Sequence, residues 1–483
     1  MTRTAVLLLL LLVLLTGTAS ARPNFVIVLT DDQDLMLGSL DFMPRTRELI
    51  GDQGITFTHH FVPLSLCCPS RATILTGLHA HNHKVYTNFP PDGGFERFEE
   101  RGHEERNLAT ALHDAGYRTA LIGKYLNGYP RREDMTHVPP GWDEWVSPVQ
   151  GSPYAAYRYT LNVNGKLVKH ASKPEDYITD VLAKHATEFV RDAAEGDQPF
   201  FLYLATFAPH KPATPARRHA GLFPGLQAPR TPSFNEANVR DKPARLRALR
   251  RLRPHHIATI DALYRKQMLS LQAVDEAVAA LVEALRETGQ LDNTYFVFTS
   301  DNGFHMGQHR MEPGKYTAYE SDVRVPFLVR GPGVPAGVTV SALTSSVDLA
   351  PTFAELAGTR LRNEPDGRSL VPLLQGRTPG DWRKVILLEQ FEYPPAPPKE
   401  GQTPFPYPAH LGLRTDRYKY VEYGKGGERE LYDLRSDPDE LVNLRDRSSK
   451  TWLSRLSALA KALGSCAGES CRQIESQPVP PEQ

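Results

Sequence analysis

Short apolar runs alternate with amphipathic segments from residue 24 to about residue 375 of this chain. Apolar runs of about four to eight residues are typical of buried strands, whereas apolar residues at every third or fourth position are typical of helices. Their alternation requires crossover connections, so it predicts an α/β fold with a large, mostly parallel sheet and helices on both faces. The predicted strands include residues 24–30, 118–123, 199–207, 294–300 and 326–330, and the predicted helices residues 44–52, 107–115, 177–195, 271–285 and 348–357.

Polar residues follow directly after several of these strands. In sheets of this kind, ligands bind just beyond the carboxyl ends of the strands, so we expect these side chains to share one site. They are Asp31, Asp32, Lys124, His210, Asp301 and Asn302.

The acidic and amide residues of this set offer only oxygen donors. Adjacent carboxylates such as Asp31 and Asp32 repel each other unless a cation or an arginine offsets their charge. Together with Asp301 and Asn302 they indicate a hard cation, Ca²⁺ or Mg²⁺, and not zinc, and mixed carboxylate and amide ligands favour Ca²⁺. Residues 31–34 taken alone are equally compatible with an Asp-rich turn that binds nothing.

The sequence LSLCCPSRATILTG at residues 64–77 places Cys67, Pro69 and Arg71 at the start of a short helical run. Free backbone N–H groups at a helix start attract anions and favour the reactive thiolate form of a cysteine placed there. An arginine nearby can form a bidentate hydrogen bond to an oxyanion. The alternative is a buried cysteine beside a helix cap.

This stretch resembles the sulfatase signature Cys-x-Pro-Ser-Arg followed by Leu-Thr-Gly. In that family a formylglycine-generating enzyme oxidises the first cysteine, here Cys67, to formylglycine, and the hydrate of its aldehyde supplies the nucleophile. Cys68 fills the free position of the motif and is expected to be a bystander. Leu78 replaces the arginine of many members, which we expect to alter packing and not chemistry.

The resemblance covers nearly the whole mature chain and implies a metal site. Asp31 and Asp32 resemble the paired metal carboxylates after the first strand, and Asp301 and Asn302 resemble the second pair. The hydrate derived from Cys67 would complete the ligand shell.

The resemblance also implies catalytic roles. Arg71 resembles the residue that holds the hydrate, and Lys124 the lysine that bridges hydrate and sulfate. His210 resembles the histidine beside the sulfate, and Lys315 the lysine near the leaving oxygen. Leu126 stands where many sulfatases have histidine, so a second catalytic histidine is in doubt.

Five motifs resemble the N-acetylglucosamine-6-sulfatases and the related extracellular heparan endosulfatases most closely: LTDDQD at 29–34, LCCPSR at 66–71, GKYLN at 123–127, SDNGFH at 300–305 and SCAGESC at 465–471. This resemblance implies an alkaline-phosphatase-like fold and a sulfated carbohydrate substrate, with a 6-O-sulfate on N-acetylglucosamine or glucosamine. Asn127, His305 and His309 are candidates for the pocket rim, and each has an equally good structural explanation.

Two other functions remain open on the sequence alone. A phosphodiesterase or phosphonate monoester hydrolase of the same superfamily would use a similar site, because the site suits any tetrahedral anion. A secreted protein that binds sulfated glycans without turnover is the second alternative, although such a protein has no use for Cys67.

The N-terminus is typical of a secretory signal peptide at residues 1–21. Arg3 provides the positive end, residues 5–15 the apolar run, and residues 19–21 the small side chains that predict cleavage after Ala21. The run is too short for a membrane span, which needs about 20 residues, although an uncleaved anchor is an alternative. A formal net charge of zero favours neither nucleic acid nor membrane as a partner.

The composition changes near residue 376. We expect residues 22–375 to form the catalytic domain and residues 376–483 a small antiparallel subdomain closed by a helix at 452–463. Its proline-rich stretch at 393–408 is typical of a linker. Residues 413–423 and 430–434 are predicted to form paired strands. Cys466 and Cys471 are more typical of a disulfide than of a metal site in an exported protein.

Two further patterns have competing interpretations. His79, His81 and His83 alternate, which suits an extended polar loop at the pocket rim better than a metal site. The basic stretch at residues 242–253 is more often a solvated helix face than a binding site for a sulfated polymer.

Overall fold

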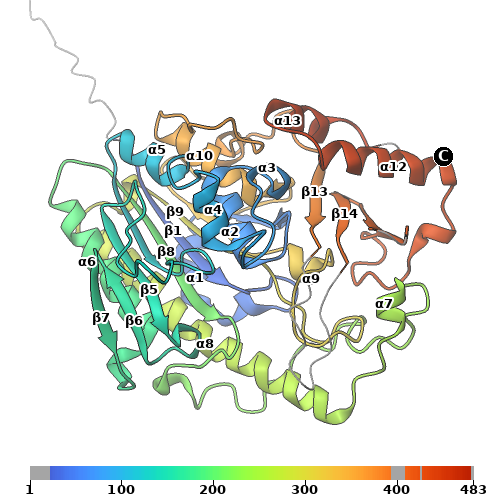
Figure 1. Cartoon of the computed structure of the whole chain (residues 1–483), viewed down its shortest axis with the longest axis horizontal. Helices are drawn as coiled ribbons and strands as arrows, with labels where there is room; N and C mark the ends of the chain where they lie inside the picture. The colour runs from blue at the N-terminus through green and yellow to red at the C-terminus, as the bar shows by residue number, and fades with distance from the viewer. Residues whose placement is uncertain (1–21, 393–407, 425–426, 480–483) are drawn as a thin grey trace, which may run out of the picture.

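The computed structural model describes residues 22–392, 408–424 and 427–479. Its centre is a ten-stranded sheet with helices on both faces, as predicted (Figure 1). The predicted leader and nearly all of the proline-rich stretch lie outside the described residues. In sheet order the strands are β11 (Val338–Val340), β2 (Ile55–Phe57), β10 (Phe327–Arg330), β9 (Thr294–Ser300), β1 (Asn24–Asp31), β8 (Phe200–Pro209), β4 (Arg118–Gly123), β5 (Glu144–Gly151), β6 (Tyr159–Val163) and β7 (Lys166–His170).

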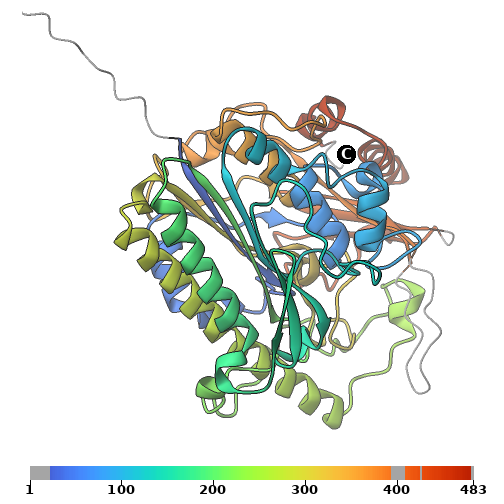
Figure 2. The ribbon, with the colours of Figure 1, turned by 60° about the vertical axis from the view of Figure 1, so that its left-hand side comes forward.

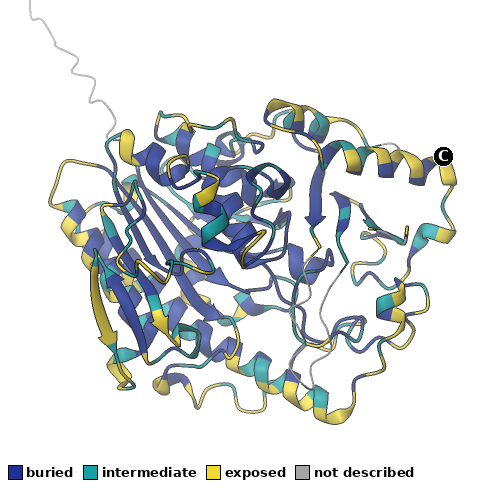
Figure 3. Cartoon of the chain, in the orientation of Figure 1, coloured by how far each residue is buried: buried dark blue, intermediate teal, exposed yellow. Residues whose placement is uncertain are grey.

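The middle of the sheet is parallel, and antiparallel pairs occur toward both ends, although the outermost pair of β11 with β2 is parallel again. β1 pairs in parallel with both β8 and β9, and β4 pairs in parallel with β8 and β5. β10 runs antiparallel to β9 and β2, and β5, β6 and β7 form antiparallel pairs that the sequence did not reveal. β7 was not predicted because this edge strand is largely exposed and so lacks the apolar run that marks a buried strand (Figure 3).

The central strand β1 is buried on both faces, which accounts for its unbroken apolar sequence. Val26 and Val28 belong to a core formed with α6 (Ile178–Ala194) and α8 (Pro254–Glu287), which lie side by side on one face (Figure 2). The intervening residues of β1 face the opposite core, because successive side chains of a strand point to opposite sides. That second core includes residues of α2 (Cys67–Thr76), α5 (Leu108–Asp114) and α10 (Leu349–Leu356).

A second, four-stranded antiparallel sheet lies in the C-terminal part of the chain, as predicted. Its strands are β13 (Val385–Gln390), β14 (His410–Thr415), β15 (Tyr418–Tyr423) and β16 (Arg429–Asp433). Trp452 and Leu456 of α12 (Lys450–Leu463) pack on this sheet. The exact boundary at residue 375 stays a prediction.

The prediction of a single strand over residues 413–423 was wrong. The chain turns between β14 and β15, where the Thr415 hydroxyl accepts hydrogen bonds from the backbone N–H groups of Arg417 and Tyr418. Such hydroxyl-centred turns compete with extended pairing, and alternation of side chains does not reveal them. Cys466 and Cys471 form the predicted disulfide, which links the segment before α13 (Glu469–Ser476) to the first turn of that helix.

A buried arginine joins the C-terminal segment to the rest of the molecule. The Arg383 guanidinium donates to both oxygens of Asp348 at 2.6 and 2.7 Å and to Glu475 of α13 at 2.8 Å. Arg383 and Asp348 are fully buried. No helix among the described residues combines the length and apolar composition needed to cross a bilayer.

We predict that Arg383→Met lowers the free energy of unfolding by about 3–5 kcal/mol, because it leaves the buried Asp348 carboxylate without its cation and Glu475 with Arg368 alone. Chemical denaturation followed by circular dichroism measures this loss. Arg377→Met is the matched control, since Arg377 is exposed and its guanidinium donates to Gln375 Oε1, a neutral partner. Equal stability of the two variants would contradict the prediction.

Candidate active site

The polar residues predicted from strand ends meet at one edge of the large sheet. Asp31 ends β1, and Asp32 follows it in a left-handed conformation with φ of 68°. Asp301 and Asn302 follow β9, and Lys124 follows β4. Because these strands are parallel, their carboxyl ends converge and bring the side chains together.

The helix α2 aims its first residue at this edge. Leu66 is extended, Cys67 begins the helix, and Gly77 ends it with φ of 69°, a conformation that suits glycine. Every residue of α2 is buried, so the helix is fixed by packing on both sides. Asn88 holds its first turn by accepting a hydrogen bond from the Cys68 backbone N–H at 2.9 Å.

Three carboxylates of the site are each paired with a cation. Lys124 Nζ lies 2.7 Å from Asp31 Oδ2, and Arg71 Nε lies 2.7 Å from Asp301 Oδ2. Lys315 Nζ bonds Asp32 Oδ1. These six residues are at most 5% exposed, so their charges are compensated largely by one another.

The two adjacent aspartates are held in their ionised forms. Burial would raise the pKa of Asp31, but Lys124 and then His210 outweigh it and hold that pKa below its ordinary value. Burial would likewise raise the pKa of Asp32, and Lys315 reverses the effect. The site therefore offers two adjacent carboxylates, which is the feature expected of a hard-cation site.

The donor set fits a divalent cation. Within the described part of the chain, Asp32 Oδ2 is buried and has no hydrogen-bond partner, as expected of an oxygen that binds a metal ion. Ligand atoms of Asp31, Asp32, Cys67 and His210 lie within 4.8 Å of one another. Asn302 borders the same group, since its Nδ2 donates to Asp32 Oδ1 at 2.7 Å.

Cys67 lies inside this group of charges. Its Sγ is 2.6 Å from Lys315 Nζ and 3.5 Å from Asp31 Oδ1. Burial raises the pKa of the Cys67 thiol to about 12, although Lys124 and Lys315 act in the opposite direction. The unmodified thiol is therefore protonated at neutral pH and is a poor nucleophile.

His210 and Asn127 stand at the more open side of the site. His210 Nε2 is 3.6 Å from Asp32 Oδ2, and its side chain is 20% exposed. Asn127 is partly exposed, with a buried Oδ1 that has no hydrogen-bond partner. Both residues are placed where a substrate could reach them.

His305 and His309 do not lie at the rim, where we expected them. Both are buried, His305 bonded through Nδ1 to Asp322 at 2.9 Å and His309 through Nδ1 to Glu236 at 2.7 Å. The sequence did not reveal this burial, because it depends on a fold of the chain after Asp301. There His305 and Gly314 exchange backbone hydrogen bonds. Substrate contact by these histidines stays a prediction.

Tyr154 is a site residue that the sequence analysis missed. Its ring lies 4.5 Å from that of His210, with Lys124 Nζ 5.4 Å from its centre. Its hydroxyl accepts from Asn127 Nδ2 at 3.4 Å. Tyr154 lies between β5 and β6, two strands that the sequence analysis did not predict. Leu126, which stands where many sulfatases have histidine, packs in the hydrophobic core.

Two sequence patterns proved to be largely structural. His79, His81 and His83 do not form an extended loop: residues Ala80–His83 form the short helix α3, and all three rings are buried. His81 bonds Glu389 at 2.9 Å. In the basic stretch, Lys242 is buried and donates to the Leu441 carbonyl at 2.6 Å. Binding of a sulfated polymer by the exposed arginines of this stretch stays a prediction.

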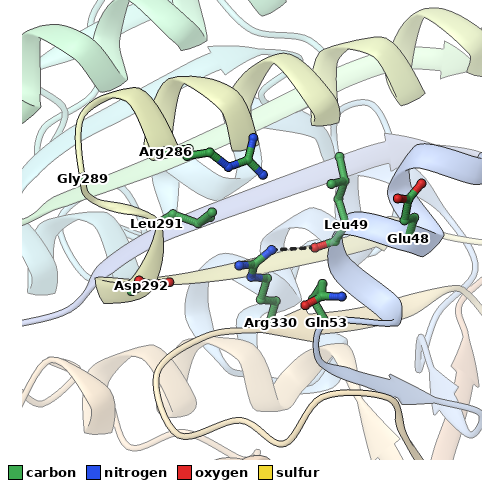
Figure 4. Close-up of a pocket in the computed structure, with 8 residues that line it drawn as sticks. All are labelled: Glu48, Leu49, Gln53, Arg286, Gly289, Leu291, Asp292 and Arg330. Atoms are coloured by element: carbon green, nitrogen blue, oxygen red, sulfur yellow. Dashed lines mark hydrogen bonds between the residues drawn. The ribbon is translucent and has the colours of Figure 1, made fainter.

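A cavity of about 470 Å³ lies at the opposite edge of the sheet, near the amino end of β9 (Figure 4). Arg330 Nη1 donates to the Leu49 carbonyl at 3.1 Å there, and Arg286 and Asp292 line it. This cavity has no residue in common with the site at the carboxyl ends of the strands.

The comparisons with known proteins agree with this geometry. A family model described as Sulfatase matches residues 23–359, and one described as N-sulphoglucosamine sulphohydrolase, C-terminal, matches residues 307–463. The N-acetylglucosamine-6-sulfatase of Homo sapiens is 36% identical over 483 residues, covering 94% of this chain and 87% of the human protein.

Other relatives are much longer than this chain. The extracellular sulfatase SULF-1 homolog of Drosophila melanogaster is 41% identical over 374 residues, which cover 76% of this chain and 33% of that protein. A Caenorhabditis elegans homologue of the same sulfatase is covered over 53% of its length.

Solved structures give the same result. One protein in complex with its substrate D-glucosamine-2-N,6-O-disulfate has a TM-score of 0.76 and 26% identity, covering 95% of this chain and 99% of its own. The phosphonate monoester hydrolase of Agrobacterium radiobacter has a TM-score of 0.70 and 25% identity, covering 92% and 95%. The chain belongs to the sulfatase family, a family of sulfuric ester hydrolases. The resemblance predicted from the motifs is thereby confirmed.

We predict that Arg71→Lys lowers kcat by about 100-fold, because an ammonium cannot bond Asp301 and the Lys124 carbonyl in the same fork geometry. Rates are divided by the fraction of converted Cys67, measured by mass spectrometry of its tryptic peptide, because Arg71 belongs to the signature. Arg101→Lys, at an exposed arginine, is the control. A normalised kcat equal to that of the control would refute the role of Arg71.

Proposed function

We propose that this chain hydrolyses sulfate esters of sulfated sugars, and that its substrate is the 6-O-sulfate of an N-acetylglucosamine or glucosamine unit. The observation that carries the proposal is the position of Cys67, buried at the start of α2 among three paired cations and carboxylates. A protonated thiol is of little use there, whereas a converted residue would be surrounded by the charges that a sulfate needs.

The proposal includes two groups that the residues can hold. Conversion of Cys67 by a formylglycine-generating enzyme would supply an aldehyde hydrate. One hydroxyl of this hydrate would attack the sulfate sulfur as the bond from sulfur to the sugar oxygen breaks, and the later loss of sulfate would restore the aldehyde. A Ca²⁺ ion, or alternatively Mg²⁺, held by Asp31, Asp32, Asp301 and Asn302 would add the positive charge that makes this sulfur easier to attack.

Lys315, Lys124 and His210 have different roles in the proposed reaction. Burial would lower the pKa of Lys315, but Asp32 outweighs it and holds that pKa well above its ordinary value, so Lys315 keeps its proton and acts as a fixed charge. Lys124 is a second fixed charge beside the sulfate. His210, which is partly open to solvent, is better suited to protonate the leaving alcohol.

The choice of a 6-O-sulfate has two supports. Relatives named N-acetylglucosamine-6-sulfatase match almost the whole chain, and the similar solved structure holds a glucosamine that carries a 6-O-sulfate. The deep burial of Cys67 favours a sulfate on a primary alcohol, because such a group protrudes from the sugar ring and can enter a recessed site.

We further propose that the protein is secreted after cleavage of the leader behind Ala21. The leader-like sequence at residues 1–21 and the extracellular relatives support this location. A phosphonate monoester hydrolase remains the alternative activity, because one such enzyme shares this fold at 25% identity. A glycan-binding protein without turnover is a weaker alternative, since it has no use for the charges around Cys67.

We predict that, among monosaccharides sulfated at the 2-, 3-, 4- or 6-position, the 6-sulfate of N-acetylglucosamine releases sulfate fastest. Differences of about 10⁴-fold are possible where a site is built to bond hydroxyl groups of one sugar. Ion chromatography measures the released sulfate. Preference for a 2- or 4-sulfate would reject the substrate, and preference for an aryl phosphodiester over an aryl sulfate would reject the sulfatase activity.

We predict that the purified protein contains about one Ca²⁺ per chain, because its ligand oxygens are those of a hard-cation site. Elemental analysis measures the metal, and Asp32→Asn should reduce its content while leaving the fold intact by circular dichroism. Stoichiometric zinc would overturn the ligand assignment.

A further inference from the structure

A cavity of about 560 Å³ lies between one end of the C-terminal sheet and the last turn of α12. We refer to it as the C-terminal cavity. It is lined by the end of β13, the start of β14, the end of β15 and the last turn of α12. The residues that matter for its chemistry are Gln390, Phe391, His410, Leu411, Tyr423 and Lys461.

One wall of the C-terminal cavity contacts segments that carry residues of the candidate active site. The ring of Phe391 stacks on that of Tyr86, with centres 4.0 Å apart. Both rings pack in a small apolar cluster with Leu66 and Tyr316. Leu66 directly precedes Cys67 and Tyr316 directly follows Lys315, so Phe391 connects the cavity lining to residues that neighbour the candidate active site in sequence.

Two buried polar atoms of the cavity lining have no hydrogen-bond partner among the residues that the structure describes. Gln390 is 3% exposed and its Oε1 accepts no hydrogen bond, and His410 is 7% exposed and its Nδ1 is likewise unpaired. Leaving such groups unsatisfied is costly, so each one in a native structure calls for an explanation. Hydroxyl groups of a bound sugar would bond both.

The remaining surface suits a sugar that carries negative charge. Phe391, Leu411 and Tyr423 give apolar area, which the carbon face of a sugar ring can cover. The acidic residues of the lining are already paired, Glu389 with His81 and Glu422 with Arg429. Lys461 is exposed and forms no ion pair among the described residues, so its charge is available to a ligand.

We propose that the C-terminal cavity binds an anionic sugar unit, sulfated or carboxylated, that neighbours the unit carrying the reacting sulfate. The inference rests on the proposed function and deepens it. It makes a sulfated sugar chain the preferred substrate, because a monosaccharide fills only the catalytic site.

The first test compares a heparin-derived tetrasaccharide with 6-sulfated N-acetylglucosamine. Lys461→Glu should raise KM for the tetrasaccharide about tenfold, with kcat nearly unchanged and with no effect on the monosaccharide. Lys450→Glu is the matched control, because Lys450 is also exposed on α12 and does not line the cavity. Equal effects of Lys461→Glu on both substrates, or no effect on either, would overturn the proposal.

The second test measures binding without turnover. In Cys67→Ser protein, the tetrasaccharide should bind at least tenfold more tightly than the monosaccharide by calorimetry, and the added Gln390→Leu should reduce this advantage. Equal Kd values for the two sugars would overturn the proposal. If no sulfated sugar is hydrolysed but the tetrasaccharide still binds more tightly, the proposed activity fails while the binding site stands.

Discussion

The mutual compensation of buried charges at the carboxyl edge of the large sheet is the constraint on which the rest of the structure depends. Asp31, Asp32 and Asp301 are nearly inaccessible to water, so each must meet a cation inside the protein. Lys124, Arg71 and Lys315 provide those cations from three separate segments. The same charges that make the carboxylates tolerable also create a place for a tetrahedral anion.

This compensation requires precise placement, and the surrounding fold supplies it. Parallel pairing of β1 with β8 and β9 brings three strand ends to one edge, and packing on both faces of β1 holds them there. The buried helix α2 then presents Cys67 to the group. A site built on strands and a helix is more rigid than one built on loops, which suits chemistry between fixed charges.

The C-terminal sheet is bonded to segments that lie close to the site. It is anchored through Arg383 to Asp348 and through Glu389 to α3, which follows α2. Its strand β13 ends at Gln390, and the next residue, Phe391, packs with Leu66 and Tyr316, which neighbour Cys67 and Lys315 in sequence. The C-terminal sheet is therefore packed against segments that carry residues of the candidate active site.

Local sequence was sufficient to predict the central strands, the residues at their ends and the helix that begins at Cys67. These features depend on short-range patterns: unbroken apolar runs, polar residues directly after them, and the motif around Arg71. Tertiary structure alone decided the burial of His305 and His309, the turn at Thr415, the helical conformation of Ala80–His83 and the arrival of Tyr154 at the site. In each case the outcome depends on contacts between residues far apart in the chain or on a turn that periodicity does not encode, and such contacts form only when the whole sheet is assembled.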